Sequence, residues 1–263
     1  MTVALAARPR LRPFTEEAVF VARSLRHSLR DVEGLVMAVA LPVMLMLMFT
    51  FVFGGAMDPS GHYVDYVVPG IILTCAGFGA SSTAVSVNTD MTRGIIDRFR
   101  TMPIRAGASL TGHIVASLAR NLVATVVVLL VGLAVGFRPS AALPDWLLAL
   151  ALVTGYILAI TALFATIGLA AASPGAASGY GFVLLFLPYL SSAFVPIDTM
   201  PAWLQPVAEH LPVTPIIDAI RALLLGMPLD GWDVLWSSVW CAGIVLVAAV
   251  WGAWLFRRKA GRR

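Results

Sequence analysis

Long apolar runs separated by short polar segments occupy most of the chain, and these runs give the first structural prediction. A helix needs about 20 mostly apolar residues to cross the hydrocarbon core of a bilayer, which is about 30 Å thick. Six runs come close to that length, at residues 35–53, 66–88, 120–137, 146–172, 176–195 and 234–256. Pro42 and Pro188 interrupt two of them, and neighbouring helices can satisfy the backbone groups that a proline frees. The pattern predicts an all-α polytopic membrane protein with six transmembrane helices.

The segment before the first run has a different pattern. Residues 1–13 are rich in arginine and proline and are expected to be disordered, whereas residues 14–33 repeat apolar positions at helical spacing with arginines mostly off that face. A basic amphipathic helix beside a membrane span is expected to lie in the headgroup plane. A packing helix of a small soluble appendage is the alternative, but twenty residues cannot build a core. We therefore predict an interfacial helix at 14–33, a transmembrane domain at 34–256 and a basic tail at 257–263.

The stretch between the fifth and sixth runs, residues 196–232, alternates prolines with short apolar pieces. It holds Pro196, Pro201, Pro206, Pro212, Pro215 and Pro228. Prolines at this frequency forbid one long helix but suit short helices with proline in the first turn. The region is predicted to form short re-entrant helices on the extracytoplasmic side, with Asp218 and Arg221 spaced to pair on one helix.

Composition and the placement of charge fix the class and the orientation. The chain has 263 residues, of which 59% are hydrophobic and only 12% charged, about half the charge of a typical soluble domain. Fifteen of the 18 basic residues lie before the first run, between the second and third runs, or after the sixth. Cytoplasmic loops retain Arg and Lys. The sequence therefore predicts a multi-pass protein of the inner or plasma membrane with both termini cytoplasmic.

Several kinds of chemistry are not expected. The single lysine, Lys259, precedes alanine, so the lysine and hydroxyl of a phosphate-binding loop are missing. The middles of the six predicted spans hold no ionisable residue, with Arg120 placed at the edge of the third, which disfavours an ion-coupled carrier. Four scattered histidines and two separate cysteines, Cys75 and Cys241, offer no metal site or nucleophile–base pair. We expect no catalytic residue, no cofactor in this chain and no nucleic-acid partner.

One sequence feature inside the second run has two interpretations. Gly77, Ser81, Ala84 and Asn88 form a stripe of small residues at helical spacing. Such stripes let transmembrane helices approach closely. A glycine-rich nucleotide loop is the alternative for "GFGASS", but the segment lies inside an apolar span and lacks the required pattern. The stripe therefore predicts helix packing.

Between the second and third runs lies the arginine-rich segment "DMTRGIIDRFRTMPIRAGASLTGHIV", residues 90–115. It resembles the coupling-helix region of type-2 ABC transporter permeases, in particular the daunorubicin-resistance group. The later stretch "SSAFVPIDTMPAWLQPVAEHLPVTPIIDAIRALLLG" is similar to the extracytoplasmic signature of the same family. The resemblance covers nearly the whole chain from residue 14 to the sixth run. A solvated basic loop that only satisfies the positive-inside rule is the alternative for residues 90–115.

The resemblance implies roles for particular residues. A coupling helix at about 91–104 would dock on an ATPase through Arg93, Gly94, Asp97, Arg98, Arg100 and Pro103. An extracytoplasmic gate would involve Pro196, Pro201, Trp203, Asp218 and Arg221. The family architecture implies two ATPase subunits, which bind ATP and Mg, and a second permease that is either this chain or a paralogue.

The cargo is predicted from side-chain character. Methionine and aromatic residues repack around varied apolar shapes, and Met44, Met48, Phe49, Phe186 and Tyr189 are candidates to line a substrate path. For any single one of them, packing against lipid or other helices is the favoured alternative. The charge-free interior of the predicted spans indicates export of a lipophilic drug or lipid-like substrate rather than a hydrophilic ion. Two alternatives stay open: a non-transporting assembly or regulatory subunit, and an exporter of a polysaccharide or lipid-linked glycan.

Overall fold

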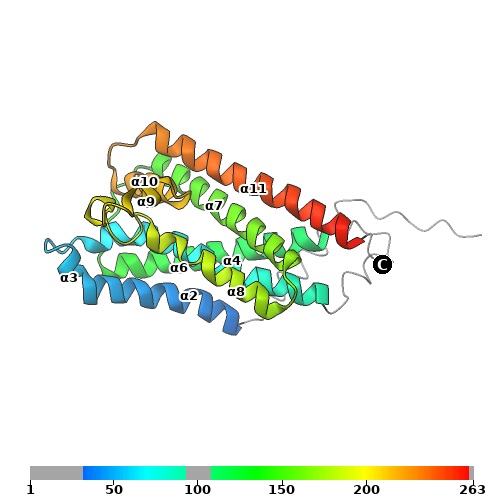
Figure 1. The fold of residues 1–263 in the computed structure, drawn as a ribbon. Helices are drawn as coiled ribbons and strands as arrows, with labels where there is room; N and C mark the ends of the chain where they lie inside the picture. The colour runs from blue at the N-terminus through cyan, green and yellow to red at the C-terminus, as the bar shows by residue number, and fades with distance from the viewer. Residues whose placement is uncertain (1–31, 93–107, 261–263) are drawn as a thin grey trace, which may run out of the picture.

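The computed structural model describes residues 32–92 and 108–260, and every regular element in these ranges is helical (Figure 1). In chain order the elements are α2 (Val32–Leu47), the π-helix η1 (Met48–Phe53), α3 (Gly54–Met57), α4 (Tyr63–Thr92), α6 (Ala108–Val135), α7 (Leu143–Ala170), α8 (Pro174–Leu184), the 3₁₀ helices η2 (Leu187–Leu190) and η3 (Ile197–Thr199), α9 (Gln205–His210), α10 (Val213–Leu225) and α11 (Gly231–Ala260). The prediction of an all-α fold is confirmed for the part of the chain that is described.

The long helices form one elongated bundle around α4. This helix contacts α2, α6, α7, α8 and α10, and most of its length is buried. The short helices α3, α9 and α10 gather at one end of the bundle, called here the α10 end (Figure 1). The other end, where α4 stops at Thr92 and α11 stops near Ala260, is called the Thr92 end. Successive long helices run back and forth between these two ends.

Small residues on α4 and its neighbours allow this close packing. A Cβ atom at Gly168 of α7 would overlap the main chain of Ala84, and one at Gly181 of α8 would lie 2.8 Å from the hydroxyl of Ser81. Asn88 donates hydrogen bonds to the carbonyl oxygens of Gly168 and Ala171. The stripe of small residues in the second span therefore packs α4 against α7 and α8, as predicted.

Five helices are long and apolar enough to cross a membrane: Ala38–Met57, Tyr63–Thr92, Leu110–Val135, Leu143–Ala170 and Gly231–Leu255. They correspond to the predicted spans one, two, three, four and six. The predicted fifth span at 176–195 is not one continuous helix. It consists of α8, a turn, and η2, because Pro188 cannot continue the α-helix. The backbone of residues 191–196 then has no regular helix. Only the shorter apolar stretch Pro174–Leu190 is available there.

The third span corrects one prediction from the sequence. The helix begins at Ala108 and its apolar part at Leu110, so Arg120 lies well inside the span rather than at its edge. The polar residues of 108–119 concealed this start, because they join the apolar segment as one continuous helix. The interior of the third span is therefore not free of charge. A central arginine costs about 2.5–3.5 kcal/mol on insertion scales.

At the α10 end, proline and glycine set the short helices. Gly226 ends α10 with φ of 62°, a left-handed conformation that suits glycine, and its N–H bonds to the carbonyl of Ala222. The amide of Ser140, in the loop after α6, donates to the carbonyl of Leu224 at 3.0 Å. This bond fastens the 136–142 connection to the end of α10. The 196–232 region therefore forms short helices, as its prolines predict.

Tryptophans mark the two ends of α11. Trp232 and Trp236 are exposed near the α10 end, and Trp254 is exposed near the Thr92 end with the Arg258 guanidinium 5.0 Å from its ring centroid. Tryptophan prefers the headgroup level of a bilayer. The eighteen positions from Trp236 to Trp254 correspond to about 27 Å of helix. The distance between Trp236 and Trp254 is therefore close to the thickness of the hydrocarbon core, about 30 Å.

Two sets of predictions lie outside the described residues: the disordered tail with most of the interfacial helix (1–31), and the coupling-helix residues 93–104. The two free cysteines, Cys75 of α4 and Cys241 of α11, are both buried, as expected.

The close packing of α7 on α4 gives a test of the bundle. We expect Gly168→Val to destabilise the protein by about 1–3 kcal/mol, because its side chain must displace backbone of α4. Gly155→Val on the same helix is the matched control, since a Cβ atom there meets nothing within 4 Å. Thermal unfolding of the detergent-purified protein, followed by size-exclusion chromatography, measures both. Equal melting temperatures for the two variants would contradict this packing.

Candidate functional site

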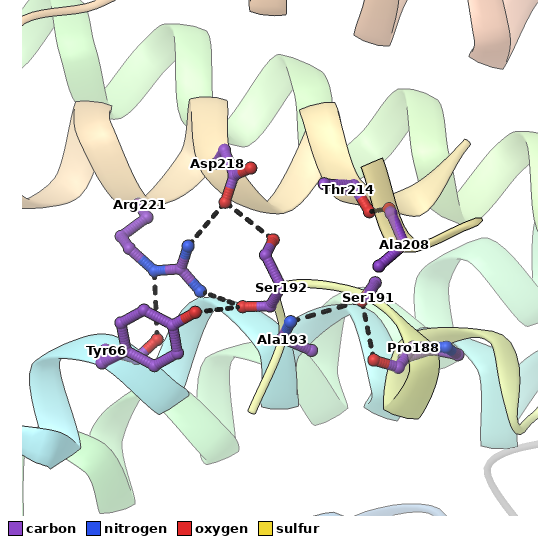
Figure 2. A network of polar contacts seen from close by, with 9 residues as sticks. All are labelled: Tyr66, Pro188, Ser191, Ser192, Ala193, Ala208, Thr214, Asp218 and Arg221. Atoms are coloured by element: carbon purple, nitrogen blue, oxygen red, sulfur yellow. Dashed lines mark hydrogen bonds and ion pairs between the residues drawn. The ribbon is translucent and has the colours of Figure 1, made fainter. Parts of the chain in front are cut away.

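The most polar contact region at the α10 end surrounds residues 191–195, the irregular segment that follows η2. Tyr66 approaches it from the first turns of α4, and Asp218 and Arg221 approach it from α10 (Figure 2). Tyr63, also in the first turn of α4, bonds to the carbonyl of Phe194. Gly70 packs directly under the segment, because a Cβ atom there would lie 2.5 Å from the carbonyl oxygen of Ala193. The segment is therefore enclosed between α4 and α10.

Arg221 is the centre of this region, and only 8% of the residue is exposed. Its Nε donates to the carbonyl oxygen of Tyr66 at 3.2 Å, and its Nη2 donates to the carbonyl oxygen of Ser192 at 2.6 Å. Its Nη1 donates to Asp218 Oδ1 at 2.6 Å. The guanidinium also lies 3.9 Å from the centroid of the Tyr66 ring. One side chain thus connects two helices and the 191–195 segment; this set of contacts is called the Arg221 network.

Asp218 completes the network from the helix turn before Arg221, which confirms the pairing expected from their spacing. Its Oδ1 accepts a hydrogen bond from the Ser192 hydroxyl at 2.7 Å as well as from Arg221. Burial raises the pKa of the Asp218 carboxyl above its ordinary value, and the positive charge of Arg221 only partly offsets this. The ion pair is therefore held in a site that penalises the carboxylate form.

The two tyrosines also bond to carbonyls of the segment. The Tyr66 hydroxyl donates to the Ser192 carbonyl at 2.8 Å, and the Tyr63 hydroxyl donates to the Phe194 carbonyl at 2.7 Å. Irregular backbone at membrane depth is tolerated only where protein or a wet cavity satisfies its polar groups. The Arg221 network supplies those partners, so the chain can leave helical geometry at this position.

Aromatic rings continue from this segment across one face of the bundle. Phe194 stacks on Phe49 of η1 with ring centroids 4.6 Å apart and on Tyr189 of η2 at 4.8 Å. Phe53 lies beyond Phe49 at 5.6 Å. Phe186, in the turn between α8 and η2, lies 6.0 Å from Tyr189, and Phe182 of α8 lies 5.1 Å from Phe186. These six rings are called the aromatic series. The series connects η1 to α8, and half of Phe186 is exposed.

The structure brings together only some of the residues that the sequence singled out. Phe49, Phe186 and Tyr189 lie in the aromatic series, while Met44 and Met48 are exposed along α2 and η1. Asp218 and Arg221 meet in the network. Pro196, Pro201 and Trp203 lie beyond it at the start of η3 and before α9, where Trp203 is 75% exposed.

The coupling residues Arg93, Gly94, Asp97, Arg98, Arg100 and Pro103 are outside the described residues.

Sequence reasoning missed Tyr63, Tyr66 and Ser192 as site residues. Two tyrosines three positions apart at the start of an apolar run are a recognisable signal of a membrane boundary. Their partners, however, lie more than 120 residues later, and no local pattern indicates that pairing.

Within the described residues, no group of three His, Cys, Asp or Glu side chains is placed to hold a metal ion. The geometry provides a buried arginine, Arg221, that holds residues 191–195 by hydrogen bonds beside the aromatic series. These features, on an apolar bundle with five candidate spans, are those of a polytopic membrane protein.

Comparison with known proteins identifies the family. Residues 16–225 match the model of the ABC-2 type transporter family. The chain is 32% identical over 225 residues to the daunorubicin resistance ABC transporter permease protein DrrB1 of Streptomyces coeruleorubidus, a match covering 84% of this chain and 78% of that protein. It is 30% identical over 242 residues to the probable doxorubicin resistance ABC transporter permease protein DrrC of Mycobacterium tuberculosis, covering 90% and 87% respectively. The chain belongs to the ABC-2 type transporter family.

The Arg221 network predicts unequal effects of its two charges. Arg221→Ala leaves the Asp218 carboxylate without its counter-charge and removes one donor from each of two carbonyls, of which the Ser192 carbonyl keeps the Tyr66 hydroxyl. We expect a loss of about 3–5 kcal/mol in the free energy of unfolding. Arg138→Ala, at an exposed arginine of the same end, is the control and should have a small effect. Thermal melting in detergent measures both. A melting temperature for Arg221→Ala within error of the control would show that the network does not hold the segment.

Asp218→Asn should cost much less, because the amide keeps an acceptor oxygen and removes the burial penalty on the carboxylate. A raised pKa means that the folded protein binds this proton more tightly than the unfolded chain does. The contribution of Asp218 to stability is therefore largest below its ordinary pKa and declines as pH rises through the raised pKa. Asp218→Asn should remove that decline in melting scans over acidic pH. If the pH dependence of the melting temperature is the same in Asp218→Asn as in the unmodified protein, Asp218 does not have a raised pKa in the folded state.

Proposed function

We propose that this chain is the membrane permease of an ABC exporter that moves a lipophilic drug or lipid-like substrate out of the cytoplasm or the inner leaflet. The observation that carries the proposal is the similarity to anthracycline-resistance permeases over most of the chain. The exposed rings of Phe182 and Phe186, at one end of the aromatic series, support an apolar cargo because aromatic rings present a large apolar surface.

ATP hydrolysis takes place on separate subunits in this proposal. Two ATPase copies, which bind ATP and Mg, act on two permeases, the second being this chain or a paralogue. Residues 93–103 would transmit the movement of the ATPase to α4 and α6, which flank them in sequence. The support is the family membership, together with a segment that is polar and charged between two long apolar helices.

The permease crosses the membrane six times in this proposal. The stretch Pro174–Leu190 starts at the Thr92 end after α7 and runs to the α10 end, where the 191–195 segment lies (Figure 1). Seventeen residues of α- and 3₁₀-helix cover about 25–28 Å, which is nearly the thickness of the hydrocarbon core. The fifth crossing is therefore a broken one, and the short helices of residues 196–232 dip into the membrane from the far side.

The Arg221 network and the aromatic series form the extracytoplasmic closure in this proposal. Phe194 lies at their junction, because its ring belongs to the series and its carbonyl bonds to Tyr63. Movement of α4 against α10 would shift both together. Pro196, Pro201 and Trp203 shape the loop that follows the closure.

The topology is tested with reporter fusions. The distribution of basic residues places the Thr92 end in the cytoplasm, so reporters at Arg263 and near Ser60 should lie on opposite sides of the membrane. A phosphatase active only outside the cytoplasm and a fluorescent protein active only inside give complementary signals. Both fusions on one side would exclude the six-crossing arrangement.

The motor contact is tested by reversing charge. Asp97→Lys or Arg98→Glu leaves every span unchanged, so expression and insertion should persist while binding to the ATPase falls by about 2–5 kcal/mol. Co-purification with the ATPase partner and permease-stimulated ATP hydrolysis measure the loss. Glu209→Lys, an exposed charge on α9 at the other end, is the control. Normal stimulation by both coupling variants would show that the ATPase docks elsewhere.

A further inference from the structure

The outward side of α11 combines apolar surface with an arginine at the Thr92 end. Four exposed residues recur there at intervals of four, three and four positions: Val247, Trp251, Trp254 and Arg258. At about 100° per residue, they lie within about 60° of one another around the helix. Leu255 instead packs against a buried cluster formed by residues of α4 and α7. The four exposed residues are called the Trp254 face.

Arg258 holds its charge at the headgroup level. Four residues of helix, about 6 Å, separate it from Trp254, and the headgroup layer on each side of a bilayer is about 5–8 Å thick. Its guanidinium lies 5.0 Å from the centroid of the Trp254 ring, so the side chain returns toward the membrane instead of extending into water. The cation therefore lies where the phosphates of a lipid leaflet would be.

The N–H groups of Arg258 are available to a ligand. Its contact with the Trp254 ring is its one interaction in the part of the chain that the structure describes, where it has no hydrogen bond and no ion pair. A guanidinium carries five N–H donors, arranged in a fork that matches two oxygens of a phosphate. A phosphate that approaches from the lipid side can therefore bind without displacing another partner.

The end of α11 is strongly basic in sequence as well. Residues 257–263 include five basic residues, and no Asp or Glu occurs after Asp233. The carbonyl groups at the C-terminal end of a helix carry about half a negative charge, which is about one tenth of that positive charge. Basic clusters next to a transmembrane helix attract anionic lipids. Charge complementarity therefore favours an anionic partner.

Other partners fit the Trp254 face less well. A symmetric contact between two parallel α11 helices would bring the five basic residues of each chain together, and like charges in an interface oppose binding. A water-soluble protein could reach Arg258 but not Val247 and Trp251, which lie on the membrane side of Trp254. A phospholipid has both an anionic head and apolar chains.

We propose that the Trp254 face binds an anionic phospholipid, with the phosphate on Arg258 and an acyl chain along Trp251 and Val247. Leu255, next to Trp254, packs against the α4–α7 cluster, so the bound lipid would stabilise the end of α11 on the bundle. The inference goes beyond the proposed function and does not depend on the cargo, because it requires only that α11 crosses a membrane.

The binding test compares phosphatidylglycerol with phosphatidylcholine carrying the same acyl chains. Native mass spectrometry of the detergent-purified full chain resolves individual bound lipids and gives the ratio of the two affinities. We expect phosphatidylglycerol to bind about fivefold more tightly or better, since the surface attraction of one cation has this magnitude. A micelle has no inside or outside, so the result is independent of the orientation of the chain. Equal affinities overturn the proposal.

The variants distinguish a site from a basic end that is only solvated. Arg258→Gln should reduce the preference for phosphatidylglycerol by about fivefold, whereas Arg258→Lys should keep most of it. Lys259→Gln is the matched control, because it removes the same charge at the adjacent position, about 100° around the helix, and should have a smaller effect. Equal losses in Arg258→Gln and Lys259→Gln overturn the site, as does an equal loss in Arg258→Lys and Arg258→Gln.

Thermal melting measures the effect of the lipid on the fold. A ligand that binds the folded protein raises its melting temperature, so phosphatidylglycerol should raise it more than phosphatidylcholine does, and this difference should shrink in Arg258→Gln. An undiminished difference in Arg258→Gln contradicts the proposal.

Two further outcomes would assign the face to something else. Glycerol phosphate, a head group without acyl chains, should not displace phosphatidylglycerol, and displacement would show that the apolar part of the face is not used. If the mass spectra show a dimer that Trp254→Ala converts to a monomer while the lipid preference stays the same, the face is a contact between copies of this chain and the proposal fails.

Discussion

The arrangement at the α10 end depends on one constraint: a backbone that leaves helical geometry inside a membrane protein must find hydrogen-bond partners within the protein. Residues 191–195 leave helical geometry, and Arg221 with two tyrosines of α4 supplies the partners. This requirement explains why a buried arginine is retained on α10. It also explains why α4 and α10, far apart in sequence, are held at a fixed separation.

The same constraint links the Arg221 network to the rest of the bundle. The Ser192 carbonyl accepts bonds from both Arg221 and Tyr66, so α10 cannot move away from α4 without exposing it. Phe194, two residues further, stacks on rings of η1 and η2. Residues 191–195 therefore contact α4, α10, η1 and η2 at once, so a displacement of any one of these helices would disturb its contacts with the other three.

The sequence predicted the helical class, the approximate position of five spans, the packing stripe on α4 and the Asp218–Arg221 pair, because each depends on local periodicity or spacing. It did not predict the start of α6, since polar residues before Arg120 belong to the same helix as the apolar ones after it. It also gave no indication that Tyr63 and Tyr66 meet residues 192 and 194, because such pairing is set by the three-dimensional course of the chain. The break in the helix of residues 176–195 was indicated only by Pro188.

The burial of both cysteines has a practical consequence for chemical labelling. Cys75 is fully enclosed at the centre of the bundle, and Cys241 is 8% exposed, so both thiols are shielded from aqueous maleimides. These are the chain's only cysteines. The native sequence is therefore already a suitable background for single-site spin labels or fluorophores, and no cysteine-free variant, with the cavity that replacement of Cys75 would create at the packed core, is required.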